Sequence, residues 1–519
     1  MKISLLFLRL FLLFLPLPGL FAQDYPINWG PAYSRDGVAI ANFRLAGFTA
    51  NRYHLVLNPR RSNTLLTFDL NHRLLKPQSL ELVYNQEDLV LDKFVETAAG
   101  TYGYFVNYDR KDNQFQLLAS AFTAETFTDV RPIYQHRYEG RWNLTPSATI
   151  GRNSGNDLGN DLEVSLDKSR VSFVNQLSAR DKNTPERCAL ALFDAELNLV
   201  WEKTHEFEYT DKQLTSVQSE VSNDGSIFLL AEITKSAEER QATRGLPRYD
   251  YRVYRFTETA VQTFDILLPA GLAPTDARLF LPDGSGKEFL LTGFYTNEAR
   301  NSGLQGIFTS RVQPESGVIS SHTAPFAEDF LRGLIRERDL KKDRGLDDNF
   351  SIQNYLQFTD GSFGFVAERS YVTSTNYVDM NGIFQETYTY HSDQLVIPRL
   401  SADGELLNVQ KVDKTFSSED YVVTSYSLAQ ANGKVYLVYN DFKNSRERRN
   451  LKNEGRGKGR YTDLCVIDEA GEIIHQSTLF SSREIDLTYL PAFSDYNGDN
   501  LLLMGVSRKK YKCGLLRLD

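Results

Sequence analysis

A repeated pattern of short apolar strands and tight polar turns runs through the chain. Its clearest copy is Leu395 to Val412, where stretches of alternating apolar and polar residues flank the pair Asp403-Gly404. Alternation around an Asp-Gly pair is a strong signal of a β-hairpin. Similar hairpins are predicted around turns near Asp69, Thr123, Asp194, Thr257, Pro314, Asp403 and Ala470, and a partial copy runs from Cys513 to the C-terminus.

These turns lie 54 to 89 residues apart, and a second, earlier hairpin precedes most of them. Its turn and following apolar strand are seen in NDGSIFLLAE from Asn223, TDGSFGFVAE from Thr359 and NGKVYLVYND from Asn432. A repeat of this length, built of strands and turns, is typical of a β-propeller. Each unit then has four antiparallel strands, which we letter A (innermost) to D (outermost).

The pattern therefore predicts an all-β fold, a β-propeller of four-stranded antiparallel blades. Eight blades are favoured, and seven is the alternative if the weak unit from Phe115 or from Gly306 is not a true blade. The last unit ends on strand C at Asp519, and an unpaired outer edge is unfavourable. We expect Asp24 to Tyr33 to supply the missing strand, so that residues 23–519 form one domain closed by strands from both termini.

One segment, 327–342, departs from the strand pattern. Its apolar residues follow helical spacing, with charged residues between them, and they are Phe330, Leu331, Leu334 and Ile335. This spacing predicts a short amphipathic helix inserted between blades five and six. Packing against the side of the propeller is the first interpretation, and a docking helix for a partner is the second.

Residues 1–22 predict a secretory signal peptide. Lys2 and Arg9 lie among Leu and Phe, and a small residue, Ala22, ends the apolar run. An uncleaved membrane anchor is the alternative, but Pro16 and Pro18 keep the run shorter than a bilayer span. No later apolar run is long enough to cross a bilayer. We therefore expect an exported protein of the periplasm, the cell surface or the extracellular space.

Charge and cysteine content narrow the class of partner. The formal net charge is −9, which disfavours nucleic acid because binding to phosphates requires a basic surface. Three cysteines cannot form a disulfide framework in a secreted chain. Cys188, Cys465 and Cys513 all fall in strands of the same predicted type. We interpret them as buried free thiols that act as small apolar residues.

The connections between strands differ on the two faces of the predicted propeller. The A–B and C–D turns are tight, whereas the B–C connections are long, and long loops on a rigid scaffold concentrate binding residues. The longest are Ser178–Glu186, Thr234–Tyr249, Tyr295–Ser302, Arg369–Ser392 and Asp441–Tyr461. The last is strongly basic and is interpreted as a solvated loop, with attraction to an acidic surface as the alternative.

The richest of these connections, Arg369 to Ser392, supplies the candidate ligand-binding residues. They are Glu368, Arg369, Tyr371, Tyr390, His391 and Asp393. Tyrosine offers contact area and a hydroxyl at low entropic cost, and arginine can hold an anionic group with two hydrogen bonds. One alternative is a β-hairpin extension whose tyrosines pack on each other. Another is that Glu368 and Asp393 form an acid–base pair.

Metal and cofactor chemistry has no support in the sequence. Asp495, Asn497 and Asp499 alternate like calcium ligands, but Asn500 and Val506 stand where a calcium loop needs Gly and Glu. We interpret this stretch as a plain A–B turn and predict no metal site and no cofactor. The chain also lacks the H-E-x-x-H, G-x-S-x-G and paired C-x-x-C motifs.

The run LDDNFSIQNYLQFTDGSFGFVAERSYV, followed by YHSDQLVIPRLSADGEL, resembles a blade of secreted propeller-like proteins of Gram-negative bacteria. The resemblance covers roughly residues 327–412 and implies fold and export only. Asp360-Gly361-Ser362 stands where a second glycine is expected.

Three functions remain open at this level. The first is a secreted binding scaffold for a protein, peptide or glycan, with no enzymatic activity. The second is a glycan-acting hydrolase or lyase that uses carboxylates and tyrosines on the long-loop face. The third is a structural part of a cell-envelope assembly.

Overall fold

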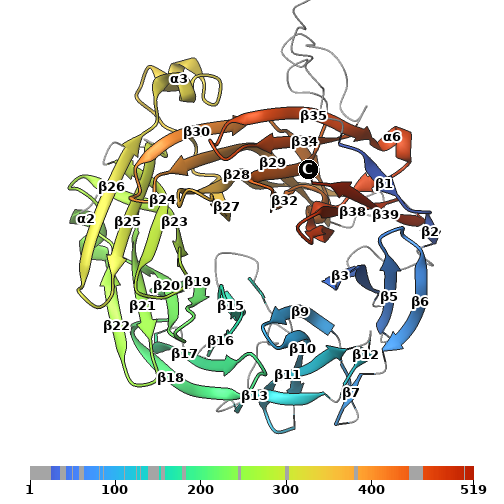
Figure 1. Ribbon diagram of the computed structural model, residues 1–519. Coiled ribbons are helices and arrows are strands. Elements are labelled where there is room, and N and C mark those ends of the chain that lie inside the picture. The colour runs from blue at the N-terminus through green and yellow to red at the C-terminus, as the bar shows by residue number, and fades with distance from the viewer. Residues whose placement is uncertain are drawn as a thin grey trace, which may run out of the picture.

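Eight sheets follow one another around a ring in the computed structural model (Figure 1). The structure describes residues 25–34, 43–49, 51–57, 63–80, 82–85, 87–89, 91–109, 111–123, 126–128, 130–137, 151–152, 158–177, 183–242, 247–297, 303–378, 384–442, 460–507 and 509–518. Within these ranges each of the eight sheets has at least four antiparallel strands. The predicted β-propeller of eight blades is confirmed, and the weak units from Phe115 and Gly306 are true blades.

The first four blades follow the chain from the inner to the outer strand. Blade 1 has β3 (Phe43–Thr49), β4 (Arg52–Leu57), β5 (Asn63–Asp69) and β6 (Leu74–Leu80). Blade 2 has β9 (Leu91–Thr97), β10 (Gly100–Asp109), β11 (Gln114–Thr123) and an outer strand in two pieces, β12 (Thr126–Phe127) and β13 (Arg131–Arg137). Blade 3 has β14 (Gly151–Arg152), β15 (Leu158–Val164), β16 (Arg170–Gln176), β17 (Pro185–Asp194) and β18 (Leu199–Thr210). Blade 4 has β19 (Leu214–Val221), β20 (Ile227–Thr234), β21 (Tyr249–Phe256) and β22 (Val261–Asp265).

The next three blades have the same order. Blade 5 has β23 (Leu272–Phe280), β24 (Phe289–Asn297), β25 (Gly306–Gln313) and β26 (Val318–Pro325). Blade 6 has β27 (Phe350–Gln357), β28 (Phe363–Val378), β29 (Phe384–Leu400) and β30 (Leu406–Val412), with β31 (Phe416–Ser418) beside β29. Blade 7 has β32 (Tyr426–Ala431), β33 (Lys434–Asp441), β34 (Tyr461–Ile467) and β35 (Ile473–Ser481). Short elements outside the blades are β7 (Val83–Tyr84), β8 (Glu87–Asp88), α2 (Ala237–Ala242), α6 (Ser482–Ile485), η2 (Tyr421–Val423) and η3 (Pro491–Phe493).

Blade 8 combines strands from both ends of the chain. Its C-terminal strands are β36 (Thr488–Tyr489), β37 (Asp495–Tyr496), β38 (Asn500–Val506) and β39 (Lys510–Arg517). The outer edge of β39 is covered by β1 (Ile27–Trp29) and β2 (Tyr33–Ser34), which pair with it in antiparallel register. The unpaired backbone edge of β39 is thereby removed.

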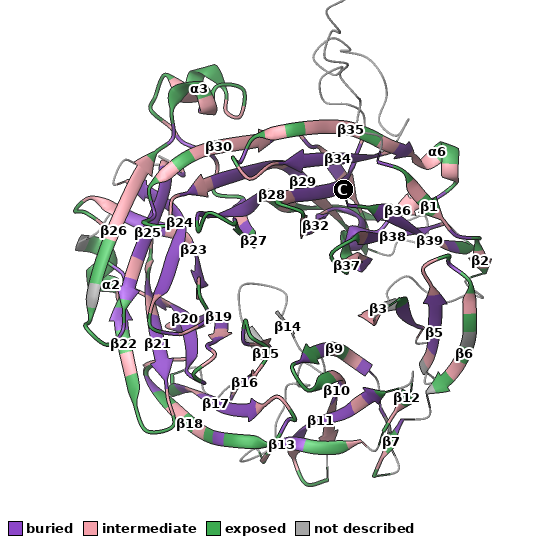
Figure 2. Cartoon of the chain, in the orientation of Figure 1, coloured by how far each residue is buried: buried purple, intermediate pink, exposed green. Residues whose placement is uncertain are grey.

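The hydrophobic core is divided among the junctions between blades. Eight clusters of buried residues are found in the described ranges, and each joins the facing surfaces of two neighbouring blades. Figure 2 shows burial along the middle strands and exposure along outer strands such as β18 and β26. Cys188, Cys465 and Cys513 lie in strand C of blades 3, 7 and 8, and all three are buried free thiols.

The inserted segment 327–342 is not one helix, contrary to the prediction. It forms two single-turn helices, α3 (Glu328–Leu331) and α4 (Glu337–Leu340). Arg332 and Arg336 have extended backbone dihedrals, and Gly333 between them has φ 95°, a conformation that glycine adopts without steric cost. The apolar side chains still meet the propeller, because Leu331 is buried in the cluster between blades 5 and 6.

On the face that carries the tight turns, arginine side chains link neighbouring blades. Arg255, Arg311 and Arg399 lie near the ends of strand C in blades 4, 5 and 6. Each reaches the C–D turn of the following blade: Arg255 Nη1 lies 2.9 Å from Glu315, Arg311 Nη1 lies 3.0 Å from Asp403, and Arg399 Nη1 donates to the carbonyl of Ala470. This face therefore presents short, bridged turns, as the sequence predicts.

Several parts of the sequence interpretation fall outside the described residues. These are the predicted signal peptide, residues 1–22, and portions of the five long connections, residues 178–182, 243–246, 298–302, 379–383 and 443–459. Among the helices that the structure does describe, none has the length and apolar character needed to cross a bilayer.

Candidate functional site

The segment that the sequence analysis treats as a long loop, Arg369 to Ser392, is mostly strand. Strands β28 and β29 continue beyond their neighbour β27, with pairs from Ser370↔Ser392 to Val378↔Phe384. We call residues 370–378 and 384–392 the blade 6 extension. The extension corresponds to the alternative that the sequence left open, a β-hairpin rather than an irregular loop.

Glu368 lies at the base of the blade 6 extension and is only 3% exposed. Its Oε1 lies 2.5 Å from Nζ of Lys414 and also accepts a hydrogen bond from Ser392, while Oε2 accepts one from Ser425 at 2.9 Å. Lys414 donates further to the carbonyl of Thr424 at 2.7 Å. Burial lowers the pKa of Lys414, and the charge of Glu368 opposes this shift. This network is a buried ion pair that holds the extension to the blade.

Arg369, the next residue in the chain, forms a second ion-pair network at the base of the extension. Its Nε lies 2.5 Å from Asp347 and its Nη1 lies 2.7 Å from Asp393. Burial alone would lower the pKa of Arg369, but the hydrogen bond and charge of Asp347 and the charge of Asp393 raise it. Burial raises the pKa of Asp393, against the effect of Arg369. The strand pairing has a register shift between Glu368 and Ser370, and such a bulge turns neighbouring side chains to different sides.

The aromatic candidates pack on one another and on nearby groups. The rings of Tyr371 and His391 stack with centroids 4.5 Å apart, and the guanidinium of Arg369 lies 5.0 Å from the centroid of Tyr371. Tyr390 lies on the opposite face of the extension, with its ring 6.0 Å from that of Tyr421. The structure therefore brings Arg369, Tyr371, His391 and Asp393 together but separates Glu368 and Tyr390 from them.

The blade 6 extension has two chemically different faces, because successive residues of a strand point to opposite sides. One face carries a threonine ladder formed by the directly opposed pairs Thr373↔Thr389 and Thr375↔Thr387. The other face carries the exposed side chains of Val372 (52%), Val378 (64%), Phe384 (66%) and Tyr388 (49%), beside the polar residues Ser374, Asn376 and Glu386. We call it the apolar face, and the exposed Tyr377 (50%) lies on the threonine face. Tyr421, which is 65% exposed, lies beside Tyr390 at the base of this apolar face.

A polar cavity of about 570 Å³ opens beside the base of the extension. Arg369 is the one candidate residue among its lining residues, which also include Arg336, Asp339, Arg344 and Asp347. Asp339 lies 2.9 Å from Arg344, and Asp347 lies 2.5 Å from Arg369, so these four charged groups of the cavity are already paired. The cavity lies between the α3–α4 insertion and blade 6.

Lys414 and the exposed apolar residues were missed by sequence reasoning. Lys414 follows β30 and shows no pattern that distinguishes it from surface lysines. Val378 and Phe384 could have been found, because the sequence between them, Asp-Met-Asn-Gly-Ile, contains an Asn-Gly pair with alternating residues on both sides, which is a hairpin signal.

No described protein family matches the sequence, and no curated protein matches it. Solved structures are similar over most of the chain. Polysaccharide lyase Uly1 shares 10% identity at a TM-score of 0.38, over 96% of this chain and 94% of that protein. The WD40 domain of SCAP from fission yeast shares 9% identity at 0.40, over 95% and 98%. The β-propeller domain of the Trilobed protease from Pyrococcus furiosus shares 9% identity at 0.35, over 86% and 95%. Similarity this distant says nothing about activity.

Proposed function

We propose that residues 23–519 form one exported propeller domain that serves as a binding scaffold, and that the blade 6 extension binds an extended peptide segment of a partner protein. The observation that carries this proposal is the exposed apolar face of the extension. Four large side chains that are about half to two-thirds exposed on one hairpin are unusual for a surface that stays in water. Clusters of this kind mark interaction sites.

An extended peptide fits the extension better than a globular surface does. Beyond the pair Phe350↔Arg369, strand β28 pairs only with β29 among the described residues, so its other edge is open as far as Val378. A peptide strand can add to such an edge through main-chain hydrogen bonds, and alternate side chains then contact one face of the sheet. The apolar face would receive apolar residues at every second position of the peptide.

The ion pairs at the base give the extension a fixed orientation. Lys414 and Glu368 hold one side, and Arg369 with Asp347 and Asp393 holds the other. A binding element that is already ordered loses less conformational entropy when the ligand arrives. Of the six residues predicted from the sequence, Glu368, Arg369 and Asp393 then act as supports. Tyr371, Tyr390 and His391, at the base of the extension, would contact the end of the bound peptide.

The test is selection of peptides from a phage-displayed random library on the purified protein. We expect selected peptides with alternating apolar residues, and we expect the double variant Phe384→Ala with Tyr388→Ala to weaken their binding by at least tenfold. Loss of an aromatic anchor from a binding surface costs about 2 kcal/mol or more. Fluorescence anisotropy with a labelled peptide measures the dissociation constant.

The matched control is Asp403→Ala, in the tight C–D turn of the same blade, where Asp403 is exposed and pairs with Arg311. This change should leave peptide affinity unaltered. The paired change Tyr371→Ala with Tyr390→Ala should also weaken binding, since these rings border the extension on both faces. The proposal is contradicted if peptides bind the Phe384→Ala, Tyr388→Ala variant with full affinity but no longer bind the Asp403→Ala variant. That result would place the binding site on the opposite face of the propeller.

A further inference from the structure

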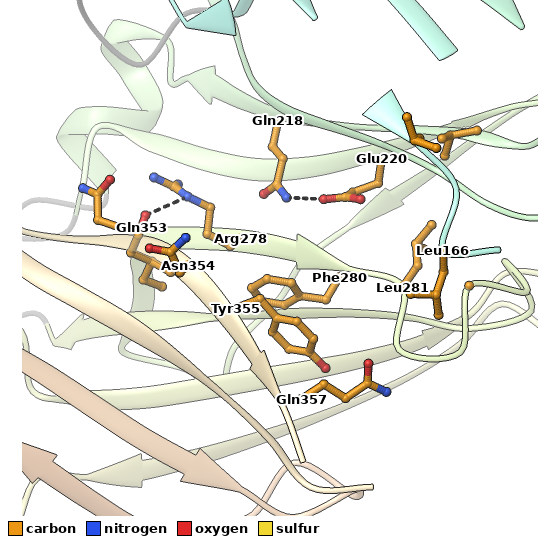
Figure 3. A pocket seen from close by; sticks show the side chains of 14 residues that line it. Leu166, Gln218, Glu220, Arg278, Phe280, Leu281, Gln353, Asn354, Tyr355 and Gln357 are labelled. Carbon is orange, nitrogen blue, oxygen red and sulfur yellow. Dashed lines mark hydrogen bonds between the residues drawn. The ribbon is translucent and has the colours of Figure 1, made fainter. Parts of the chain in front are cut away.

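The inner strands of four neighbouring blades line a cavity of about 340 Å³, which we call the axial cavity because inner strands form its wall (Figure 3). It lies between β15, β19, β23 and β27, toward the face with the tight turns, because Val221, Phe280 and Gln357 at the ends of their strands belong to its wall. Its volume is at the lower end of the range of small-molecule sites, roughly 300–1,000 Å³. The cavity is separate from the blade 6 extension and shares no residue with the peptide site proposed above.

Polar groups from three strands form part of the wall. The side chain of Arg278 is 8% exposed, its Nη1 lies 2.9 Å from Asp276, and its Nε and Nη1 donate to the carbonyls of Ile352 and Ala277. Oε1 of Glu220 accepts a hydrogen bond from Gln218 at 2.7 Å, and Tyr355 adds a hydroxyl. Small-molecule sites typically combine a few such polar groups with an apolar surface.

β-Bulges in three of the strands that line the cavity set the directions of the side chains in its wall. Strands β19, β23 and β27 each have a register shift at a corresponding position, after Ser216, Pro274 and Ile352. A bulge re-aims the side chains that follow it, and bulges are frequent beside binding sites. Gln218 and Arg278 follow two of these bulges, and each bonds the next inner strand. The amide of Gln218 bonds both the N–H and the carbonyl of Leu279, and Arg278 Nε donates to the carbonyl of Ile352.

The wall is polar without a strong net charge. Arg278 is paired with Asp276 at 2.9 Å. Burial and the neighbouring Glu163 raise the pKa of Glu220, which favours the uncharged form of this carboxyl. Phe280 and Tyr355 form an apolar part of the wall, with ring centroids 4.0 Å apart. The exposed amides of Gln353, Asn354 and Gln357 add donors and acceptors around it.

From this arrangement we infer that the axial cavity binds a neutral saccharide. A sugar ring carries hydroxyls that both donate and accept, which matches the mixture of guanidinium, carboxyl, phenol and amide groups in the wall. Its C–H groups suit the Phe280–Tyr355 portion. An anionic sugar would need an uncompensated cation, and Arg278 is already compensated by Asp276.

The probe is an array of neutral and acidic oligosaccharides, followed by isothermal titration with the neutral oligosaccharide that binds most strongly. We expect Gln353→Trp, which places a bulky ring in the cavity from an exposed position, to weaken binding by at least tenfold. Gln353→Ala should have a much smaller effect. Tyr355→Phe, which removes only the hydroxyl, should weaken binding severalfold without altering the fold.

The hairpin variant Phe384→Ala with Tyr388→Ala is the control, and saccharide affinity should not change in it. Failure of the peptide proposal would therefore leave this inference intact, and the reverse also holds. The inference is overturned if the folded protein binds no neutral glycan on the array, or binds only acidic glycans. It is also overturned if the Gln353→Trp and Tyr355→Phe variants both bind the oligosaccharide with full affinity, or if a selected peptide displaces the oligosaccharide from the protein.

Discussion

Replacing Lys414 by methionine is expected to lower the free energy of unfolding by about 3–5 kcal/mol, because removal of one member of a buried ion pair leaves the other charge uncompensated. The side chains of Lys414 and Glu368 are 0% and 4% exposed, so water cannot take the place of the missing ammonium group. Ser392 and Thr424 would also each lose a hydrogen-bond donor. Chemical denaturation followed by circular dichroism measures this change as a lower midpoint at an unchanged slope.

Lys411→Met is the matched control for Lys414→Met. Lys411 lies on β30, is only partly buried, and its Nζ donates to the exposed carbonyl of Arg332 at 3.2 Å. Its replacement should change stability by less than about 1 kcal/mol. The double variant Lys414→Met with Glu368→Gln should recover part of the loss, because no buried charge then remains unpaired. Equal effects of Lys414→Met and Lys411→Met would contradict the ion-pair role.

Deletion of residues 23–35 is expected to have the second large effect, a fall of the melting temperature by more than about 10 °C or loss of a single cooperative transition. These residues contain β1 and β2, which cover the edge of β39. They also connect two blades: Tyr33 stacks on Tyr511 of blade 8 and donates to the carbonyl of His72, which follows β5 of blade 1. Trp29 packs edge-on against Phe480 with centroids 5.3 Å apart.

A chain that begins at residue 23 is the reference for this deletion, so that only the closing strands differ. A milder version of the same test is Gly514→Ala, because a Cβ at this position would lie 2.7 Å from the ring of Trp29 and displace it. Both changes should lower the melting temperature, and the deletion should lower it more than Gly514→Ala does. A deletion variant that melts like the reference would show that the ring is held closed without β1 and β2.

The blade architecture could be predicted because it depends on local signals. Alternating residues around Asp403-Gly404 define a hairpin whatever surrounds it, and Gly404 indeed has φ 92° in the turn. The spacing of such hairpins then implies blades, and the missing outer strand of the last blade implies a strand donated from elsewhere. Helix length was less predictable: the residues at helical spacing in 327–342 meet the core, but Gly333 interrupts the backbone between them.

The candidate site shows the limit of the same reasoning. The sequence marked Glu368, Arg369 and Asp393 as one group because they are close in the chain or flank one connection. It could not show that a bulge sends Glu368 inward to Lys414 and leaves Arg369 outside with Asp347 and Asp393. The axial residues Gln218, Arg278 and Tyr355 were missed because they come from three blades, more than 50 residues apart in the chain.

The sequence by itself determined the repeated hairpins of the blades and the face that carries tight turns, and it favoured eight blades over seven, since each depends on contacts between residues near each other in the chain. The tertiary structure decided which polar residues are buried and paired, which remain exposed, and which line the axial cavity. Those properties depend on how eight sheets meet around one axis. A residue such as Lys414 or Arg278 acquires its partners only when distant strands have packed beside it, and a local pattern of residues cannot predict those contacts.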